Sequence, residues 1–166
     1  MSRYAQLGIK DIASRNDEEP QFQVGGKYYD AENDRVVQYV LFNNGTGNLA
    51  AIAGYLAYWH TRTASTFTVT RDVSDSAPNL VAGVFLYAAT DAYYTFIQVG
   101  GYHSAVETDA GDDIVKGEQV IAHATEDGEL ERVAAGTAAP YRVVGITTAA
   151  DVDADDTVAV LLQLDE

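Results

Sequence analysis

The feature that most constrains the fold is a recurrence of short runs rich in β-branched and aromatic residues. The first two runs are RVVQYVLF at 35–42 and STFTVTRDV at 65–73. Residues of these types favour strands. Turn signals recur every 8–12 residues through the last hundred positions, a spacing that is typical of sandwiches and barrels. We therefore predict a mainly β fold, an antiparallel β-sandwich or barrel.

The later runs pair most simply as hairpins. Asp127-Gly128 stands between two alternating runs, and Asp-Gly in that position is the strongest short-range hairpin signal. The polar break Thr90-Asp91 separates another two runs in the same way. Three hairpins are predicted, and they join 80–89 to 93–100, 118–125 to 129–135, and 141–149 to 157–164.

Helical signals are weak. The sequence allows a short helix at 3–15 and an alanine-rich helix at 48–58, but neither has a full set of caps. We predict an extended or partly helical N-terminal arm over residues 1–35 and a single β-rich domain over residues 36–166. With no cysteine in the sequence, disulfides and thiol catalysis are excluded.

Charge is unevenly distributed along the chain. The net charge is −15; residues 1–83 carry 7 basic and 9 acidic side chains, and residues 84–166 carry 3 and 16. Such a field repels phosphate backbones, so we expect no nucleic-acid partner. No run of about 18 apolar residues is present, so we expect no membrane partner. Aspartate outnumbers glutamate 16 to 9 and lysine occurs three times, which favours a halophilic source over an ordinary acidic surface.

The segment VVQYVLFNNGTGNLAAIAGYLAYW at 36–59 resembles the start of a dinucleotide-binding unit. Gly45, Gly47 and Ala50 match the glycine positions, and Asp72 lies at a tolerable distance for a ribose ligand. However, hairpins follow instead of a second βαβ unit, and hairpins give antiparallel sheets. We therefore interpret the glycines as a turn and predict no cofactor.

Acidic residues at alternate positions near the C-terminus could form a calcium-binding loop. Three aspartates alternate as in a calcium loop, namely Asp151, Asp153 and Asp155. Counted from the first of them, position six is Asp156 instead of glycine and position twelve is Leu162 instead of glutamate, so the EF-hand pattern fails. A different calcium site that also uses the pair at 112–113 and a solvated acidic turn both stay open.

No pattern in the sequence indicates catalysis. His60, His103 and His123 lack the spacing of metal-binding motifs. The acidic pair at 126–127 lies on a predicted turn tip, where catalytic carboxylates would be poorly held. We predict that the protein is not an enzyme.

Several phrases resemble small β-rich head proteins of tailed viruses, which are capsid decoration or minor capsid proteins. They are NLVAGV, IQVGGY, GDDI followed after one residue by KG, VVGI and AADVDADDTVAVL. The likeness covers most of residues 36–164. It implies a β-sandwich or barrel that binds the assembled major capsid protein, often as a trimer or other ring. With the acidic excess, it also implies a virus of a halophilic host.

We therefore predict a virion structural protein that lies on the outer surface of an icosahedral capsid. A turret or tail component is one alternative, and a glycan- or cell-surface-binding β module that uses exposed tyrosines is another. The apolar segment after the glycine turn is predicted to form core or a subunit interface. The interface candidates are Leu49, Tyr55, Tyr58 and Trp59.

Overall fold

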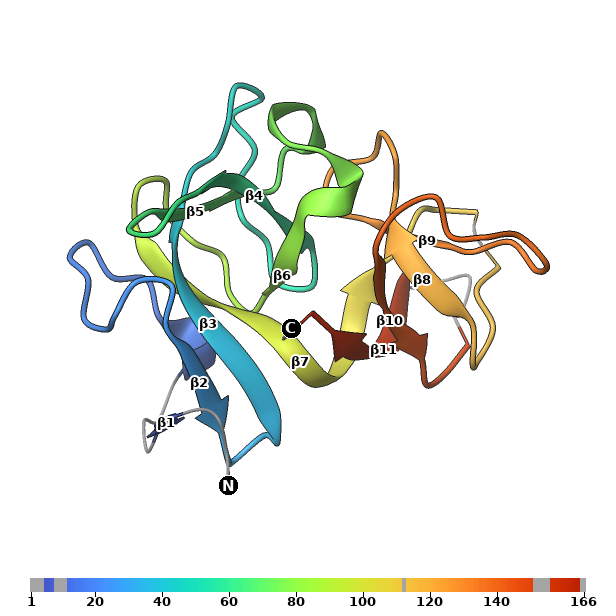
Figure 1. Cartoon of the computed structure of the whole chain (residues 1–166), viewed down its shortest axis with the longest axis horizontal. Helices are drawn as coiled ribbons and strands as arrows, with labels where there is room; N and C mark the ends of the chain where they lie inside the picture. Colours follow the sequence, from blue (N-terminus) through green and yellow to red (C-terminus); the bar gives the residue numbers. More distant parts are fainter. Residues whose placement is uncertain (1–4, 8–11, 112, 151–155, 165–166) are drawn as a thin grey trace.

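The computed structural model describes residues 5–7, 12–111, 113–150 and 156–164 (Figure 1). Within these residues the regular elements are β-strands and three short 3₁₀-helices, with no α-helix. No helix among them is long and apolar enough to cross a membrane. The strands are β1 Ala5–Leu7, β2 Lys27–Asp30, β3 Arg35–Phe42, β4 Leu56–Arg62, β5 Phe67–Thr70, β6 Val81–Phe85, β7 Tyr94–Glu107, β8 Gln119–Ala122, β9 Leu130–Arg132, β10 Val143–Thr147 and β11 Thr157–Gln163. The 3₁₀-helices are η1 Ile12–Ser14, η2 Val73–Asp75 and η3 Pro78–Leu80.

Five strands close into a barrel in the order β3–β5–β4–β6–β7, and the pairing of β3 with β7 completes the ring. The β3–β5 pairing is parallel and the other four are antiparallel. The barrel is therefore mixed. The mainly β prediction is confirmed, and so are the three predicted hairpins, which form as β6–β7, β8–β9 and β10–β11.

A second group of strands extends from β7 in the order β7–β11–β10–β8–β9. Its far edge returns to β7, because Thr108 forms a parallel bridge with Leu130 and Asp109 N donates to Leu130 O at 3.1 Å. Figure 1 shows this group beside the barrel, with β7 running from one to the other. One long strand thus joins the two halves.

Strand β7 is longer than predicted. The run at 93–100 is predicted to end at Gly100, but the strand continues through a bend to Glu107. At Gly101 φ is +87°, and a Cβ there would lie 2.7 Å from Asp34 O. Because glycine adopts this conformation at little cost, the chain bends instead of ending, and its second part pairs with β11.

Apolar side chains form two clusters. The larger one fills the barrel and the space under the second group of strands, and it includes the edge-to-face pair Phe42 and Phe85 at 5.5 Å. The smaller one lies on the outer side of β3 and β7, where Tyr39 and Phe96 are fully buried. Phe22 covers both of those rings, with centroid distances of 5.2 Å to each. The described part of the predicted arm therefore packs on the barrel of its own chain.

The alanine-rich helix that the sequence allows at 48–58 does not form. Asn48 and Gly54 have φ of +53° and +92°, which interrupts any right-handed helix, and Leu56 begins strand β4. The described part of 3–15, where the sequence allows a second helix, holds strand β1 and the single 3₁₀ turn η1 instead.

Candidate functional site

The glycine turn at 45–47 faces two carboxylates of its own chain. Gly47 N donates to Asp72 Oδ2 at 2.9 Å, and Thr46 donates to Asp75 through both its N–H and, at 2.7 Å, its hydroxyl. A Cβ on Gly47 would lie 2.7 Å from Asp72 Oδ2. Glycine is therefore needed here because a carboxylate approaches the backbone closely.

Asp72 organises this turn from a buried position, since only 2% of it is exposed. Ser74 N and Ser74 Oγ also donate to its carboxylate. Burial alone would raise the pKa of Asp72, but the hydrogen bonds from Ser74 and Gly47 outweigh it and hold the pKa below its usual value. A cofactor phosphate would meet these carboxylates where it needs free amides, which supports the interpretation as a turn.

The four interface candidates divide into two pairs. Tyr58 is fully buried and Trp59 is 9% exposed, and both rings belong to the larger core cluster. Leu49 and Tyr55 are half-buried, and the Arg71 guanidinium lies 4.2 Å from the centre of the Tyr55 ring. Tyr58 and most of Trp59 thus form core, while an interface role for Leu49, Tyr55 and the exposed edge of Trp59 stays a prediction.

The calcium candidates Asp151, Asp153 and Asp155 lie outside the described residues, so that interpretation also stays a prediction. Within the described ranges, no group of three or more His, Asp or Glu side chains is placed to hold a metal ion. His123 lies 3.6 Å from a Glu131 oxygen and 3.9 Å from an Asp109 oxygen.

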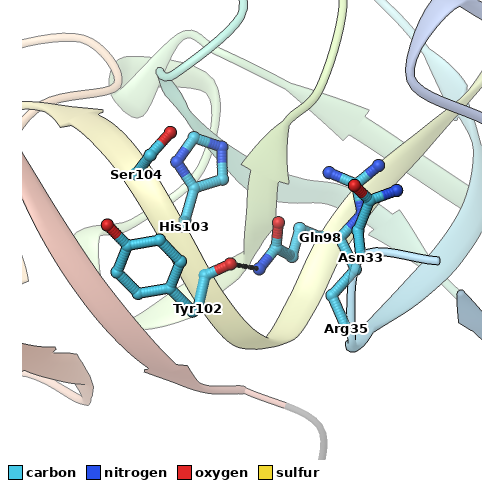
Figure 2. A pocket seen from close by; sticks show the side chains of 6 residues that line it. All are labelled: Asn33, Arg35, Gln98, Tyr102, His103 and Ser104. Carbon is cyan, nitrogen blue, oxygen red and sulfur yellow. Dashed lines mark hydrogen bonds between the residues drawn. The ribbon is translucent and has the colours of Figure 1, made fainter. Parts of the chain in front are cut away.

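A polar hollow of about 230 Å³ lies beside the bend of β7 (Figure 2). Six residues line it: Asn33, Arg35, Gln98, Tyr102, His103 and Ser104. Gln98 is fully buried, and its Nε2 donates to Tyr102 O at 2.9 Å and to Gly100 O at 3.3 Å. Within the described part of the chain, Gln98 Oε1 has no hydrogen-bond partner. A buried acceptor without a partner costs about 1–3 kcal/mol.

Two features keep the hollow close to electrically neutral. Arg35 Nε and Asn33 Nδ2 both donate to Asp30 Oδ2, at 2.8 and 2.9 Å. Burial raises the pKa of Asp30, but these partners outweigh it and keep the pKa below its usual value. Burial and then the Arg35 charge lower the pKa of His103 to about 4. His103 Nδ1 accepts from Ala105 N at 3.3 Å, which leaves Nε2 as a donor when the ring is neutral.

A second, shallow hollow gathers positive charge, and we call it the cationic site. Lys27, Arg62 and Arg142 line it together with Trp59, and the Arg62 guanidinium lies 5.1 Å from the centre of the Trp59 ring. Three of the chain's ten basic residues thus meet at one place, and none of the described residues that line it is acidic. Its volume of about 10 Å³ is the space of roughly one water, so it suits contact with another surface and not an enclosed ligand.

Sequence reasoning missed both hollows, because each draws on strands far apart in the chain. Arg35 meets the bend of β7 only through the pairing of β3 with β7, in which Arg35 lies opposite Gly101. The pair Gly100-Gly101 was the available signal, since glycine inside a strand pattern marks a bulge or a close backbone approach. Nothing in the sequence links Lys27, Arg62 and Arg142.

No protein-family profile matches the chain, and no curated protein matches it.

Proposed function

We propose that this protein is a non-enzymatic virion structural protein that binds the outer surface of an assembled icosahedral capsid, as a decoration, cementing or minor capsid protein. It would act as a trimer or other ring on a virus of a halophilic host. The resemblance in the sequence supports this role. The closed barrel also suits a protein that acts by binding a surface. Closure leaves the barrel strands without exposed edges, which could otherwise pair with strands of other chains.

The cationic site is the observation that carries the proposal. A chain of net charge −15 repels another acidic protein over most of its surface. At the cationic site Arg62 and Arg142 place positive charge around a large aromatic side chain. Arginine and tryptophan are enriched at the centres of protein interfaces. This face would therefore meet an acidic patch of the major capsid protein.

Co-sedimentation with capsids that lack the protein tests the role. We expect the purified protein to sediment with assembled capsids at high salt and not to bind unassembled capsid protein. No affinity for capsids at any salt concentration would contradict the role. Particle imaging separates it from a turret or tail component, since a decoration protein covers the shell while a tail protein is present in few copies.

Charge reversal at the cationic site tests the docking face. Arg62→Glu with Arg142→Glu should weaken capsid binding by roughly tenfold or more, because two attractive contacts become repulsive. The control variant combines Lys116→Glu with Arg132→Glu. It makes the same change in net charge at two exposed positions outside the cationic site. Equal loss in both double variants would show that only net charge matters and would contradict this face.

Trp59 provides a direct reporter of docking. It is the single tryptophan of the sequence and lies against Arg62 in the wall of the cationic site. Capsid binding at this face should therefore change its fluorescence, read against capsids alone. Binding without any such change would place the contact elsewhere on the protein.

A further inference from the structure

The polar hollow beside the bend of β7 is not needed for docking at the cationic site, and it has the composition of a small-molecule site. Figure 2 shows Gln98 between the β7 residues 102–104 and the pair Asn33 and Arg35. Its volume of about 230 Å³ lies below the range of roughly 300–1,000 Å³ for drug-sized ligands. A single ring of a hydroxylated molecule is a suitable occupant.

The orientation of the Gln98 amide is fixed by its donors. Nε2 gives its hydrogens to Tyr102 O and Gly100 O, and a flipped amide would place its oxygen against both carbonyls. Gln98 Oε1 is thus left as an acceptor in a fully buried side chain, with no partner among the described residues. Asn33 is held similarly, because its Nδ2 donates to Asp30 and its Oδ1 faces away from that bond. The Gln98 amide is therefore a fixed, buried part of the wall, while the exposed amide of Asn33 is the one that a ligand in the hollow can reach.

Donors line the same hollow. Ser104 has a hydroxyl group, His103 presents Nε2–H when its ring is neutral, and Arg35 has guanidinium hydrogens beyond the Nε that Asp30 binds. Tyr102, which is 53% exposed, provides an aromatic face at the rim. A group that both donates and accepts, such as a hydroxyl, matches this mixture better than a pure acceptor.

Charge argues against an anion in the hollow. The Arg35 charge is offset by the carboxylate of Asp30 at 2.8 Å, the lowered pKa of His103 keeps its ring uncharged near pH 7, and the whole chain carries −15. We propose that the polar hollow binds one neutral sugar unit, with its hydroxyls bonded to the exposed side chains of Asn33 and Ser104 and its C–H face against the ring of Tyr102.

Titration of the intact protein with neutral sugars, followed by NMR of the backbone and asparagine side-chain amides, tests this site. The probes are methyl glycosides of glucose, galactose and mannose, with glucuronate as the anionic counterpart. At least one neutral glycoside should shift the Asn33 side-chain amide and the amides of 102–104, with a dissociation constant on the order of 1 mM. No shift at about 100 mM sugar, or stronger binding of glucuronate, would overturn the proposal.

Two exposed side chains of the hollow can be changed without disturbing the core. Tyr102→Ala and Ser104→Ala should each weaken sugar binding by roughly fivefold or more, because stacking or a hydroxyl bond is lost. Tyr87→Ala is the matched control, since Tyr87 is 44% exposed and does not line the hollow. Unchanged binding in both hollow variants, or equal weakening by Tyr87→Ala, would overturn the site. Capsid binding is measured separately, so a negative result for sugar binding does not count against the proposed capsid role, and the reverse also holds.

Discussion

At the scale of single residues, Asp72 connects three parts of the chain, two through its carboxylate and one through its backbone N–H. It accepts from Gly47 in the glycine turn and from both groups of Ser74, so it also caps the short helix η2. The N–H of Asp72 itself donates to Thr70 Oγ1 at the end of β5. The glycines at 45 and 47 are thus explained by a carboxylate that the chain supplies and by close packing, without a bound phosphate.

Removal of this carboxylate should destabilise the protein measurably. Asp72→Ala leaves Gly47 N and Ser74 N without their acceptor and removes a cap, which we expect to lower the free energy of unfolding by about 2–4 kcal/mol. Urea denaturation monitored by circular dichroism measures it. Asp75→Ala is the control: Asp75 also binds the turn but is less buried, so a loss of about 1 kcal/mol is expected.

The effect of Asp72 should also depend on pH. Because the pKa of Asp72 is lower in the folded protein than its ordinary value of 3.8, the unfolded chain binds the proton more readily. The carboxylate therefore contributes its full stability above about pH 4 and loses it as pH falls through the folded-state pKa. The difference between wild type and Asp72→Ala should narrow in that acid range, and a difference that widens there would contradict the assignment.

At the scale of elements, the β8–β9 hairpin shows what the sequence could and could not predict. Asp127-Gly128 predicted the turn correctly, since its local chemistry suffices. The sequence did not predict that this turn packs against the barrel. Leu56 N donates to Gly128 O at 2.7 Å, and Val73 N donates to Asp127 Oδ1 at 2.8 Å. The tip, expected to hold carboxylates poorly, thus fixes Asp127 through a partner 54 residues away.

Strand β4 failed prediction for a related reason. Leu56, Ala57, Tyr58 and Trp59 are buried in succession, so neither side of the strand faces water and the alternation that marks a half-exposed strand is missing. A continuous apolar run of this kind cannot be told from a buried helix by periodicity. Strand β3, in contrast, was predicted to its last residue, because its run of β-branched and aromatic residues has only one interpretation.

Docking of the hairpin can be tested at Gly128. Its φ is +81°, and a Cβ there would lie 2.8 Å from Arg71 Cγ and 3.0 Å from Tyr55 Cδ1. Gly128→Ala should lower the free energy of unfolding by about 2–3 kcal/mol, from backbone strain together with displacement of those side chains. Gly136→Ala is matched in backbone strain, since φ is +78° and no atom lies within 4 Å of its Cβ position. About 1–2 kcal/mol is expected there, and equal losses at the two glycines would show that the turn is not tightly docked.

At the scale of the whole molecule, charge divides along the chain at about the point where the second group of strands begins. Residues 84–166 carry 3 basic and 16 acidic side chains, and they include β8–β11 and the second part of β7. The cationic site combines Lys27 and Arg62 from the first half with Arg142 from the second. The acidic second half of the chain and the proposed docking face therefore carry opposite charge on one small protein.

Salt should consequently act on stability and on capsid binding in different ways. Screening shortens the Debye length from about 30 Å at 0.01 M to about 3 Å at 1 M, which weakens repulsion among the acidic side chains. We expect the melting temperature to rise by roughly 5–10 °C over this range, measured by differential scanning calorimetry in NaCl with an uncharged osmolyte as the control. A melting temperature that is flat or falls with salt would contradict self-repulsion. Charges in close contact at the cationic site are screened less than charges far apart. The proposed capsid binding should therefore weaken with salt less than an attraction between distant charges would. On a virus of a halophilic host, both the folded protein and its binding to capsids should persist at molar salt.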